Sequence, residues 1–439
     1  MQRDDGLDRR TLLKGAGMTA MAGAAGAPGL AMAATRSGTK YDFDTVYRRV
    51  GTNSVRWDQP IAKYAQKDLI AGMGVADLDF RCAPVITEAL KKRVAHENWG
   101  YAEMPKSFPE TIAKWNKERY GITINPDHLE FTAGVHPGVI AAIRAFGPPG
   151  SKVLLTTPTY NGFYGDLIKA STLPSESPMH LVDGRYVIDF DDFERRISAD
   201  TKTFLLCNPQ NPTGNCWSRE DLTRLGEICL RKGAIVLADE IHCDFVTAGN
   251  SYTPFATLDP EIARNSITFK AASKSFGLSS LKCGWCFSDN AELMAAFRNA
   301  HRPDWPPIGM IASEAAYSGG KEWLEQMLAY VDGTLDFAER YIAENIPLVK
   351  FAKPQGTYLA WLDVREAMEK IGAERLAHEH NESPETAFEE WLVKNAKVHM
   401  AAGHTYGIGG AGHMRMNLAA SRKTVAQALA SIAAALRNA

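Results

Sequence analysis

Short, continuously apolar runs alternate with helix-patterned segments along most of this 439-residue chain, and this alternation constrains the fold more than any other feature. Helical patterns such as Gly138–Phe146 and Arg219–Lys232 separate the apolar runs. Buried strands that alternate with helices are typical of a largely parallel sheet with both faces covered. The sequence therefore predicts an α/β protein. Its predicted strands are Leu129–Thr132, Val153–Thr156, Thr203–Leu206, Ala234–Ala238 and Ser266–Phe269.

A different pattern begins near Pro303 and predicts a smaller α+β domain at the C-terminal end. It comprises a long helical stretch over 309–345, interrupted at Gly319-Gly320, a strand-like Thr357–Asp363, and helices near Ala387–Asn395 and over Arg422–Arg437. A chain of this length is expected to form two packed domains. We predict a large domain over 76–302, a small domain over 303–439, and an N-terminal arm over 35–75 that contributes to the small domain.

The segment 1–34 differs in kind from the rest of the chain. Arg9-Arg10 precede a weakly apolar stretch of Ala, Gly, Met and Leu, and Ala31-Met32-Ala33 suits a signal peptidase. The segment resembles a twin-arginine export signal, which predicts a periplasmic or secreted protein. An amphipathic helix or a membrane anchor is the alternative. The stretch is too weakly apolar for a stable span, and no second apolar run of about 20 residues follows it.

Charge and cysteine content limit the partners. A formal net charge of −2 gives no reason to expect a nucleic-acid or anionic-membrane partner. Seven cysteines, an odd number, do not indicate a disulfide framework. Cys283 and Cys286 have the spacing of a redox motif, but they lie in a strand-like stretch, and we interpret them as packing residues. No metal forms part of the site hypothesis.

Two predicted strands are followed by side chains that can carry chemistry. Asp239 comes directly after Ala234–Ala238, and Lys274, between Ser273 and Ser275, follows the next predicted strand. Ligands of parallel sheets bind outside the carboxyl ends of the strands. A lysine amine can condense with an aldehyde, nearby hydroxyls can bind a phosphate, and a carboxylate can hold a protonated ring nitrogen. These are the requirements of pyridoxal 5′-phosphate (PLP).

The same edge of the predicted sheet offers an anion site. Gly134-Val135-His136 follows the strand Leu129–Thr132 and precedes a helix. Backbone N–H groups at such a helix N-terminus attract a phosphate, and Ser273 adds a hydroxyl. We therefore expect Gly134, Val135, His136 and Ser273 to bind the phosphate of the cofactor.

Six segments in a fixed order identify a family resemblance. They are Gly74–Phe80, Thr157–Tyr164, Asn208–Gly214, Asp239–His242, Ser273–Phe276 and Gly356–Asp363. With these segments the chain, from Tyr41 to its C-terminus, resembles fold-type-I PLP enzymes of the class I/II aminotransferase superfamily. It is most similar to the MalY/PatB group of carbon–sulfur β-lyases. The resemblance implies the fold-type-I architecture, a homodimer with shared active sites and an amino-acid substrate.

The resemblance also implies a role for each matching residue. Lys274 would hold PLP covalently and then remove the substrate's α-proton, and Asp239 would pair with the pyridine nitrogen. Asn211 would donate a hydrogen bond to the ring oxygen, although Asn-Pro also simply forms turns. Tyr160 would stack on the ring. Arg415 would bind the substrate α-carboxylate through two parallel hydrogen bonds.

Three further residues depend on the same resemblance. Lys282 stands where aminotransferase relatives commonly carry an arginine, and would bind the phosphate with a less directional charge. Tyr101 would reach the cofactor phosphate and the substrate of the neighbouring subunit. His242 stands where aminotransferases commonly carry tyrosine and β-lyases carry histidine. We expect it beside the cofactor, and a packed histidine at the end of a strand is the alternative.

One motif points elsewhere and is set aside. Gly407, Gly409 and Gly412 fit the dinucleotide pattern G-x-G-x-x-G, but that pattern must follow a strand, open a helix and precede an acidic residue. Here a strand-like His413–Asn417 follows, and no Asp or Glu occurs after Glu390. We interpret the glycines as a flexible loop that delivers Arg415 to the site.

The cofactor alone does not determine the reaction. Loss of the substrate α-proton can lead to transamination or to expulsion of a group from the β-carbon, and the protein decides between them. Spacing and composition do not choose. The resemblance favours a β-lyase that splits cystathionine or cysteine S-conjugates into pyruvate, ammonia and a thiol. An aminotransferase of an α-amino acid and a PLP-binding regulatory protein remain the alternatives.

Overall fold

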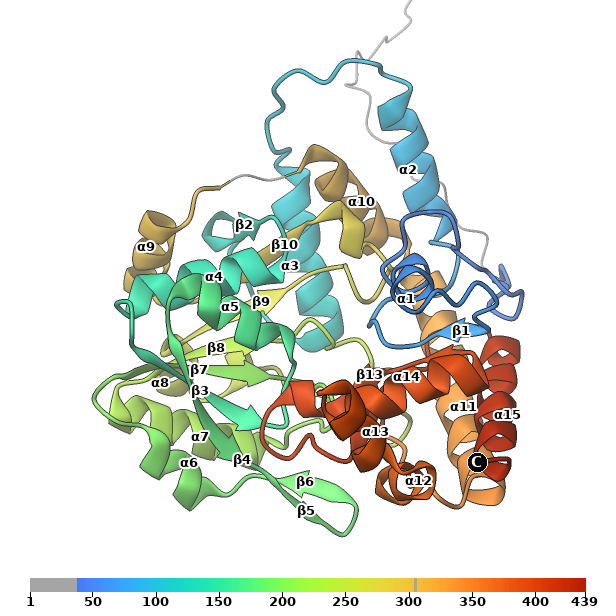
Figure 1. The fold of residues 1–439 in the computed structure, drawn as a ribbon. Coiled ribbons are helices and arrows are strands. Elements are labelled where there is room, and N and C mark those ends of the chain that lie inside the picture. Colours follow the sequence, from blue (N-terminus) through green and yellow to red (C-terminus); the bar gives the residue numbers. More distant parts are fainter. Residues whose placement is uncertain (1–37, 304–305) are drawn as a thin grey trace, which may run out of the picture. The chain divides into compact units, whose positions relative to one another are not determined.

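The computed structural model describes residues 38–303 and 306–439 (Figure 1), so the predicted export signal at 1–34 lies outside the described residues. Its main sheet has seven strands in the order β2-β10-β9-β8-β7-β3-β4. β10 is antiparallel to both neighbours, and the other pairs are parallel. The predicted mostly parallel sheet is confirmed. Its strands are β2 (Glu130–Thr132), β3 (Lys152–Thr157), β4 (Leu173–Pro178), β7 (Thr201–Cys207), β8 (Ile235–Asp239), β9 (Ser266–Lys270) and β10 (Gly284–Phe287).

Helices cover both faces of this sheet because successive strand residues point to opposite faces and both sets are apolar. Leu155, Leu205 and Leu237 pack with α4, α5 and α9, whereas Leu154 and Val236 pack with α6, α7 and α8. The helices are α4 (Val135–Phe146), α5 (Gly162–Ala170), α6 (Phe190–Arg196), α7 (Arg219–Lys232), α8 (Pro260–Arg264) and α9 (Ala291–Ala300). α7 begins with a capping box between Ser218 and Asp221, and Gly233 ends it in the left-handed conformation.

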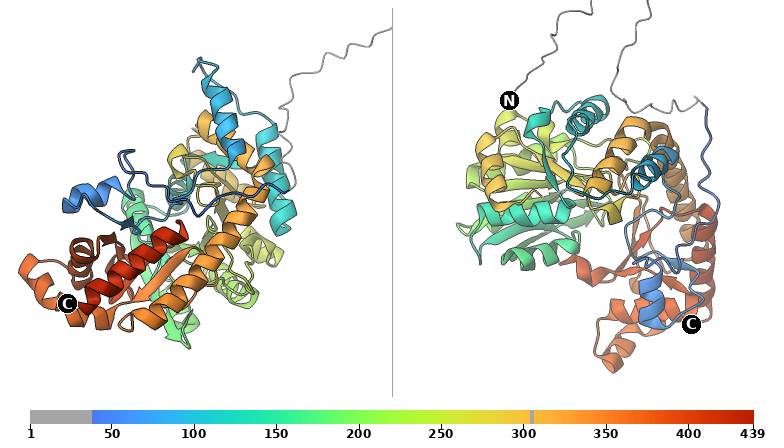
Figure 2. Two further views of the ribbon diagram at one scale, coloured as in Figure 1. Left: turned by 90° about the vertical axis from the view of Figure 1, so that its right-hand side faces the viewer. Right: turned by 90° about the horizontal axis from the view of Figure 1, so that it is seen from above.

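A second group of elements follows residue 306 and contains a three-stranded sheet in the order β11-β14-β13. The predicted long helix is two helices, interrupted at Gly320 as expected. α10 packs on the N-terminal helices α2 and α3, whereas Figure 2 shows the orange and red elements of the C-terminal sheet beside the green and yellow sheet. The group comprises α10 (Pro307–Gly319), α11 (Lys321–Asn345), β11 (Leu359–Asp363), α12 (Arg365–Ile371), α13 (Ala373–His380), α14 (Pro384–Ala396), β12 (Val398–His399), β13 (Ala401–Ala402), β14 (His413–Asn417) and α15 (Arg422–Arg437).

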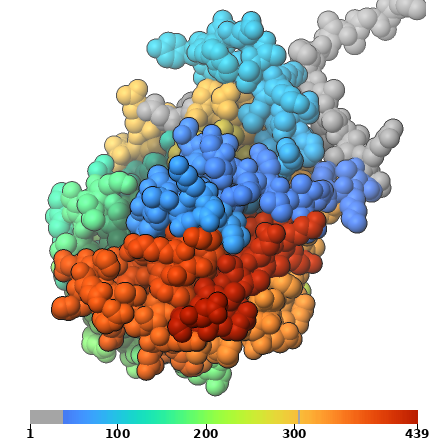
Figure 3. All heavy atoms as spheres, turned by 45° about the vertical axis from the view of Figure 1, so that its right-hand side comes forward, coloured from blue at the N-terminus to red at the C-terminus, as the bar shows by residue number. Residues whose placement is uncertain are grey.

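The N-terminal segment packs on these C-terminal elements. β1 (Ala71–Gly72) pairs with β12, and Ile70 N–H donates to the Lys397 carbonyl at 2.8 Å. In Figure 3 the blue N-terminal atoms lie directly against the red and orange ones. The predicted boundaries of the arm at 35–75 and of the two domains at 302 stay predictions. The remaining elements are α1 (Asp58–Tyr64), α2 (Pro84–Val94), α3 (Ser107–Tyr120), and the hairpin of β5 (His180–Val182) and β6 (Arg185–Val187).

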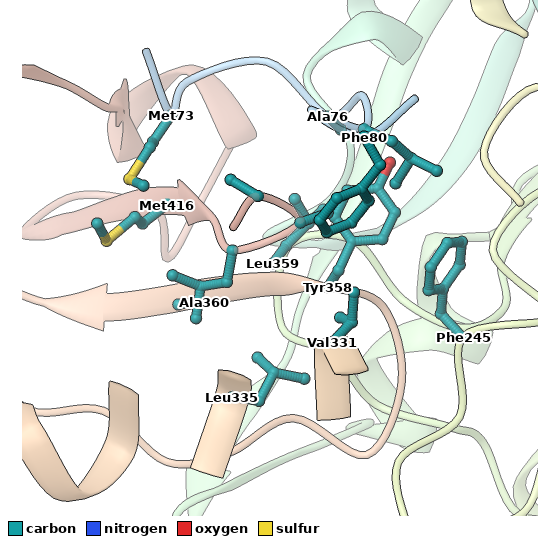
Figure 4. Packing of buried hydrophobic residues seen from close by; sticks show 14 of the residues in the cluster. Met73, Ala76, Phe80, Phe245, Val331, Leu335, Tyr358, Leu359, Ala360 and Met416 are labelled. Carbon is teal, nitrogen blue, oxygen red and sulfur yellow. The ribbon is translucent and has the colours of Figure 1, made fainter. Parts of the chain in front are cut away.

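One apolar core joins the N-terminal segment to the C-terminal sheet. Ala76 and Phe80 lie near Tyr358, the residue that leads into β11 (Figure 4). Val331 of α11 and Phe245, from the loop after β8, belong to the same cluster. This core fixes the segment 74–80 between the two groups of elements. None of the described helices is long and apolar enough to cross a membrane.

Candidate active site

The loops that follow β2, β3, β7, β8 and β9 converge at the carboxyl edge of the main sheet. The register aligns Cys207 of β7 with Asp239 of β8 and Asp239 with Phe269 of β9, so these strands end at one level. Tyr160 follows β3, and Lys274 follows β9. Because parallel strands present their carboxyl ends to a common crevice, the loops bring together residues that are far apart in the sequence.

Asp239 is a buried carboxylate, 5 % exposed, at the end of β8. It accepts one backbone hydrogen bond, from Ile241 N–H at 3.1 Å. Burial raises the pKa of Asp239 to about 6, against the opposing influence of that hydrogen bond and of the charges of His136 and Lys274. A carboxylate in this position is stabilised by a cationic hydrogen-bond donor at its free oxygen. A protonated pyridine nitrogen is such a donor.

Lys274 lies in the turn after β9, and its Nζ donates to the Ala76 carbonyl at 2.7 Å. Burial and the nearby charge of Arg415 lower its pKa to about 8. A fraction of the amine is therefore neutral near pH 7, as both condensation and proton abstraction require. The carbonyl of Ala76 is itself held in place, because Asn417 of β14 donates to the carbonyls of Val75 and Asp77 at 2.6 and 2.7 Å.

The turn between β2 and α4 has the geometry of an anion site. Gly134 precedes the first residue of α4 with φ +109°, a conformation that favours glycine. The backbone of β10 lies against this turn, since a Cβ on Gly284 would be 2.8 Å from the Gly134 carbonyl carbon. Thr132 Oγ1 donates to the Gly134 carbonyl at 2.7 Å. The N–H groups of Val135 and His136 consequently stand at the start of a well-held helix.

Arg415 of β14 meets Asn211, from the loop after β7, at another side of the site. Arg415 is 3 % exposed, and its guanidinium donates to Asn211 Oδ1 at 3.1 Å and to the Gly74 carbonyl at 2.7 Å. Since Oδ1 of Asn211 accepts from Arg415, its amide nitrogen is the group left to donate to a ligand. Arg415 also lies over the ring of Tyr406, 5.1 Å from its centroid.

His242 is buried beside Tyr358, with ring centroids 5.6 Å apart. Burial, with the charges of Lys274 and Arg415, holds the pKa of His242 well below its usual range, so the imidazole is neutral. Within the described residues, neither His242 Nδ1 nor the Tyr358 hydroxyl has a hydrogen-bond partner. Buried polar groups normally have partners, so these atoms have capacity for a polar ligand.

Tyr160 and His136 lie together against Gly162, the first residue of α5. Their rings are 5.5 Å apart, and His136 Nε2 lies 3.3 Å from the Tyr160 hydroxyl. Nδ1 of His136 pairs with the buried carboxylate of Asp166 in α5. Burial raises the pKa of Tyr160 to about 12, so its hydroxyl stays protonated. Asp166 and Tyr406 thus support the site, although no sequence motif distinguished them.

Three further residues that the sequence predicts for the site differ in their exposure to solvent. Ser273 is buried in the Lys274 turn, whereas Lys282 is exposed and adopts the left-handed conformation at φ +57°. Tyr101 is fully exposed on the loop after α2, and the structure gives it no contact with the site residues described above.

Cys283 and Cys286 are buried, and burial raises the pKa of both thiols, which favours packing over redox chemistry.

These residues fit PLP. A buried carboxylate without a cationic hydrogen-bond partner suits the pyridine nitrogen, a lysine of lowered pKa suits the aldehyde, and the Gly134 turn suits the phosphate. The neutral imidazole and the buried arginine have atoms without partners among the described residues. Buried polar groups normally have partners, and bound PLP with its substrate would supply them here.

Comparison with known proteins identifies the family. Residues 70–432 match the family model described as aminotransferase class I and II, and the chain belongs to this family. It is 36 % identical over 400 residues to the cystathionine beta-lyase PatB of Bacillus subtilis, covering 90 % of this chain and all of PatB.

Two solved structures extend the comparison. Cystalysin of Treponema denticola, which contains pyridoxal 5′-phosphate, superposes with a TM-score of 0.83 at 28 % identity over 91 % of this chain and all of cystalysin. The PLP-bound C-S lyase of Staphylococcus hominis gives a TM-score of 0.80 at 29 % identity, over 91 % of this chain and 98 % of that lyase. The chain is accordingly a PLP-dependent enzyme of the carbon–sulfur β-lyase kind.

Proposed function

We propose that this enzyme splits the Cβ–S bond of cystathionine or of a cysteine S-conjugate, giving pyruvate, ammonia and a thiol. The observation that carries the proposal is the likeness to carbon–sulfur lyases over about nine-tenths of the chain. The residue-level arrangement supports it. Lys274, Asp239 and Arg415 meet at one carboxyl edge, and histidine rather than tyrosine follows Asp239 three positions on.

The proposed reaction needs residues that bind the cofactor, bind the substrate and accept a proton. Bound PLP supplies an electron sink that stabilises negative charge at the substrate's α-carbon. Arg415 would bind the α-carboxylate, and Asp239 would keep the ring nitrogen protonated. The Nζ of Lys274, with a pKa of about 8, accepts the α-proton. Asn211 would donate to the ring oxygen, and the Gly134 turn, Ser273 and Lys282 would bind the phosphate.

His242 favours elimination over transamination in this proposal, because β-lyase relatives carry histidine at this position and aminotransferases commonly carry tyrosine. The buried ring is neutral and lies near the positive charges of Lys274 and Arg415. The side chain of Tyr358 lies beside the His242 ring. Its hydroxyl has no partner among the described residues and is available to donate to a departing sulfur.

One assay separates this function from its alternatives. The purified enzyme receives L-cystathionine without any keto acid, and pyruvate and free thiol are measured. We expect equal amounts of both. Turnover that depends on an added keto acid would instead identify an aminotransferase. Bound PLP with no turnover of any amino acid would indicate a regulatory protein.

We also propose that the enzyme is a homodimer, with Tyr101 of one subunit at the phosphate of the other. The exposed loop after α2 supports this, since Trp99 is 59 % exposed and Tyr101 fully exposed. Large exposed aromatic residues on one loop are typical of an interface. The substitution Tyr101→Ala should weaken PLP binding and leave the protein folded. A monomer in sedimentation velocity that retains full activity would contradict the proposal.

Export of the protein by the twin-arginine route is likewise a proposal, and it is based on Arg9-Arg10 and the weakly apolar residues after them. Replacing both arginines by lysine should retain the enzyme in the cytosol of a bacterial host. Immunoblots of the separated periplasmic and cytosolic fractions measure this. An unchanged distribution would refute it.

A further inference from the structure

A buried carboxylate that the mechanism does not use lies directly behind the Lys274 turn. Asp244 follows Asp239 and His242 on the loop after β8, and its side chain is 4 % exposed. It accepts hydrogen bonds from three side chains, which are Arg119 Nε, the Tyr120 hydroxyl and the Ser275 hydroxyl. Ser275 is the residue next to Lys274 and is fully buried. One carboxylate thus connects α3, the Asp239 loop and the Lys274 turn.

From this geometry we infer that Asp244 is a positioning residue, which holds Lys274 at the cofactor site through Ser275. The inference depends on the proposed role of Lys274. Within the turn, Phe276 N–H donates to the Ala272 carbonyl and Leu278 N–H to the Ser273 carbonyl, both at 3.0 Å. These bonds shape the turn locally, but neither ties it to the loop that carries Asp239.

The Ser275–Asp244 bond makes that connection. Among the described residues, it is the only side-chain hydrogen bond between the turn that carries Lys274 and the loop that follows Asp239. The amine of Lys274 and the carboxylate of Asp239 must contact opposite parts of one small ring system, so their separation has to be fixed. A side-chain hydrogen bond between the two segments restrains this separation more strictly than packing alone.

The surroundings make Asp244 a rigid anchor. Arg119 also pairs with Glu325 of α11. Burial opposes its charge, but the negative charges of Asp244 and Glu325 outweigh burial and raise the pKa of Arg119, so it stays a cation. Lys270 lies 3.8 Å from the centre of the Tyr120 ring, and Cys243 Sγ lies 3.3 Å from the Tyr120 hydroxyl. A carboxylate held by a charged donor and two hydroxyls has little freedom to move.

The test compares two variants, each of which lacks one of the two hydroxyls that donate to Asp244. Ser275→Ala cuts the link to Lys274, whereas Tyr120→Phe removes a donor and leaves the turn attached. Full-length protein stripped of cofactor is mixed with PLP and quenched with borohydride at timed intervals. The peptide that contains Lys274 is then quantified by mass spectrometry. Loading joins the lysine nitrogen to the aldehyde carbon and releases one water, so the measured rate reports directly on the position of the amine.

We expect Ser275→Ala to slow loading about tenfold and Tyr120→Phe to change it less than about threefold. Asp244→Asn should follow Ser275→Ala, and thermal melts of the stripped proteins verify that each variant is folded. Equal slowing by Ser275→Ala and Tyr120→Phe, or an unchanged rate in Ser275→Ala, would overturn the inference. In either case a label that remains on Lys274 would leave the role of this lysine intact. A label on another lysine of the unmodified protein would overturn the site assignment itself.

Discussion

Replacing Asp239 by asparagine should stabilise the cofactor-free protein at pH 7, although it damages the site. Burial raises the pKa of this carboxyl from 3.8 to about 6, a difference that corresponds to roughly 3 kcal/mol. A raised pKa means that the folded protein binds the proton more tightly. The stabilisation from this group is therefore complete below pH 4 and is lost as the pH rises through 6. At pH 7 the folded protein bears the full cost of the buried charge.

Asparagine removes that charge, and its side-chain oxygen can still accept from Ile241 N–H. Its buried amide group costs about 1–2 kcal/mol without a partner, which leaves a net stabilisation of about 1–2 kcal/mol at pH 7. In the presence of PLP the effect reverses, because the pyridine nitrogen loses its charged partner. We expect at least about tenfold weaker cofactor binding.

Urea unfolding of the stripped protein at pH 7 and pH 4.5 measures the first effect, and titration of the visible cofactor absorbance measures the second. The matched control is Asp166→Asn, which removes the negative charge that pairs with His136 and should destabilise the protein. The stabilisation by Asp239→Asn should shrink at pH 4.5, where the native carboxyl is largely protonated. Destabilisation equal to that of the control at pH 7, or a gain independent of pH, would refute the reasoning.

Three further predictions follow from the same site. Arg415→Lys should lower kcat/KM for cystathionine about 100-fold, mainly through KM, because lysine cannot form two parallel hydrogen bonds with a carboxylate. Unchanged steady-state kinetics would contradict this role. The imidazole of His242 should not titrate between pH 5.5 and 8 in NMR spectra of the stripped protein, since its pKa lies well below 6.5. A midpoint near 6.5 would show that the ring is solvated. The loading rate of PLP should rise with pH around a midpoint of about 8, as the amine of Lys274 becomes neutral; a flat profile would contradict the lowered pKa.

Much of the fold could be predicted because both faces of the main sheet are buried. The apolar runs at Thr203–Leu206 and Ser266–Phe269 coincide with β7 and β9 to within three residues at each end. β4 (Leu173–Pro178) escaped prediction, since Leu-Pro-Ser-Glu-Ser-Pro has neither the apolar content nor the alternation of a strand. It lies at the edge of the sheet, where proline is tolerated and only one neighbour is required.

The candidate site was predictable where chemistry demands a particular residue type at the end of a strand. Lys274 and Asp239 belong to this class, and Arg415 follows from the resemblance. The supporting residues could not be predicted. Asp244 and Asp166 act through contacts between elements 31 and 30 positions apart in the sequence, and acidic residues on loops and helices are ordinarily solvated. Only the folded arrangement shows that both are buried and paired.

The attachment site of the cofactor tests the central claim most directly. Enzyme loaded with PLP is reduced with borohydride and digested, and the modified peptide is identified by mass spectrometry. Lys270 and Lys282 serve as internal controls, because the first is a buried lysine at the end of β9 and the second an exposed one before β10. The predicted result is one phosphopyridoxyl group per chain on Lys274, with Asp239→Asn labelled at the same residue. A label on Lys270 or Lys282, or full labelling of Lys274→Ala, would contradict the assignment.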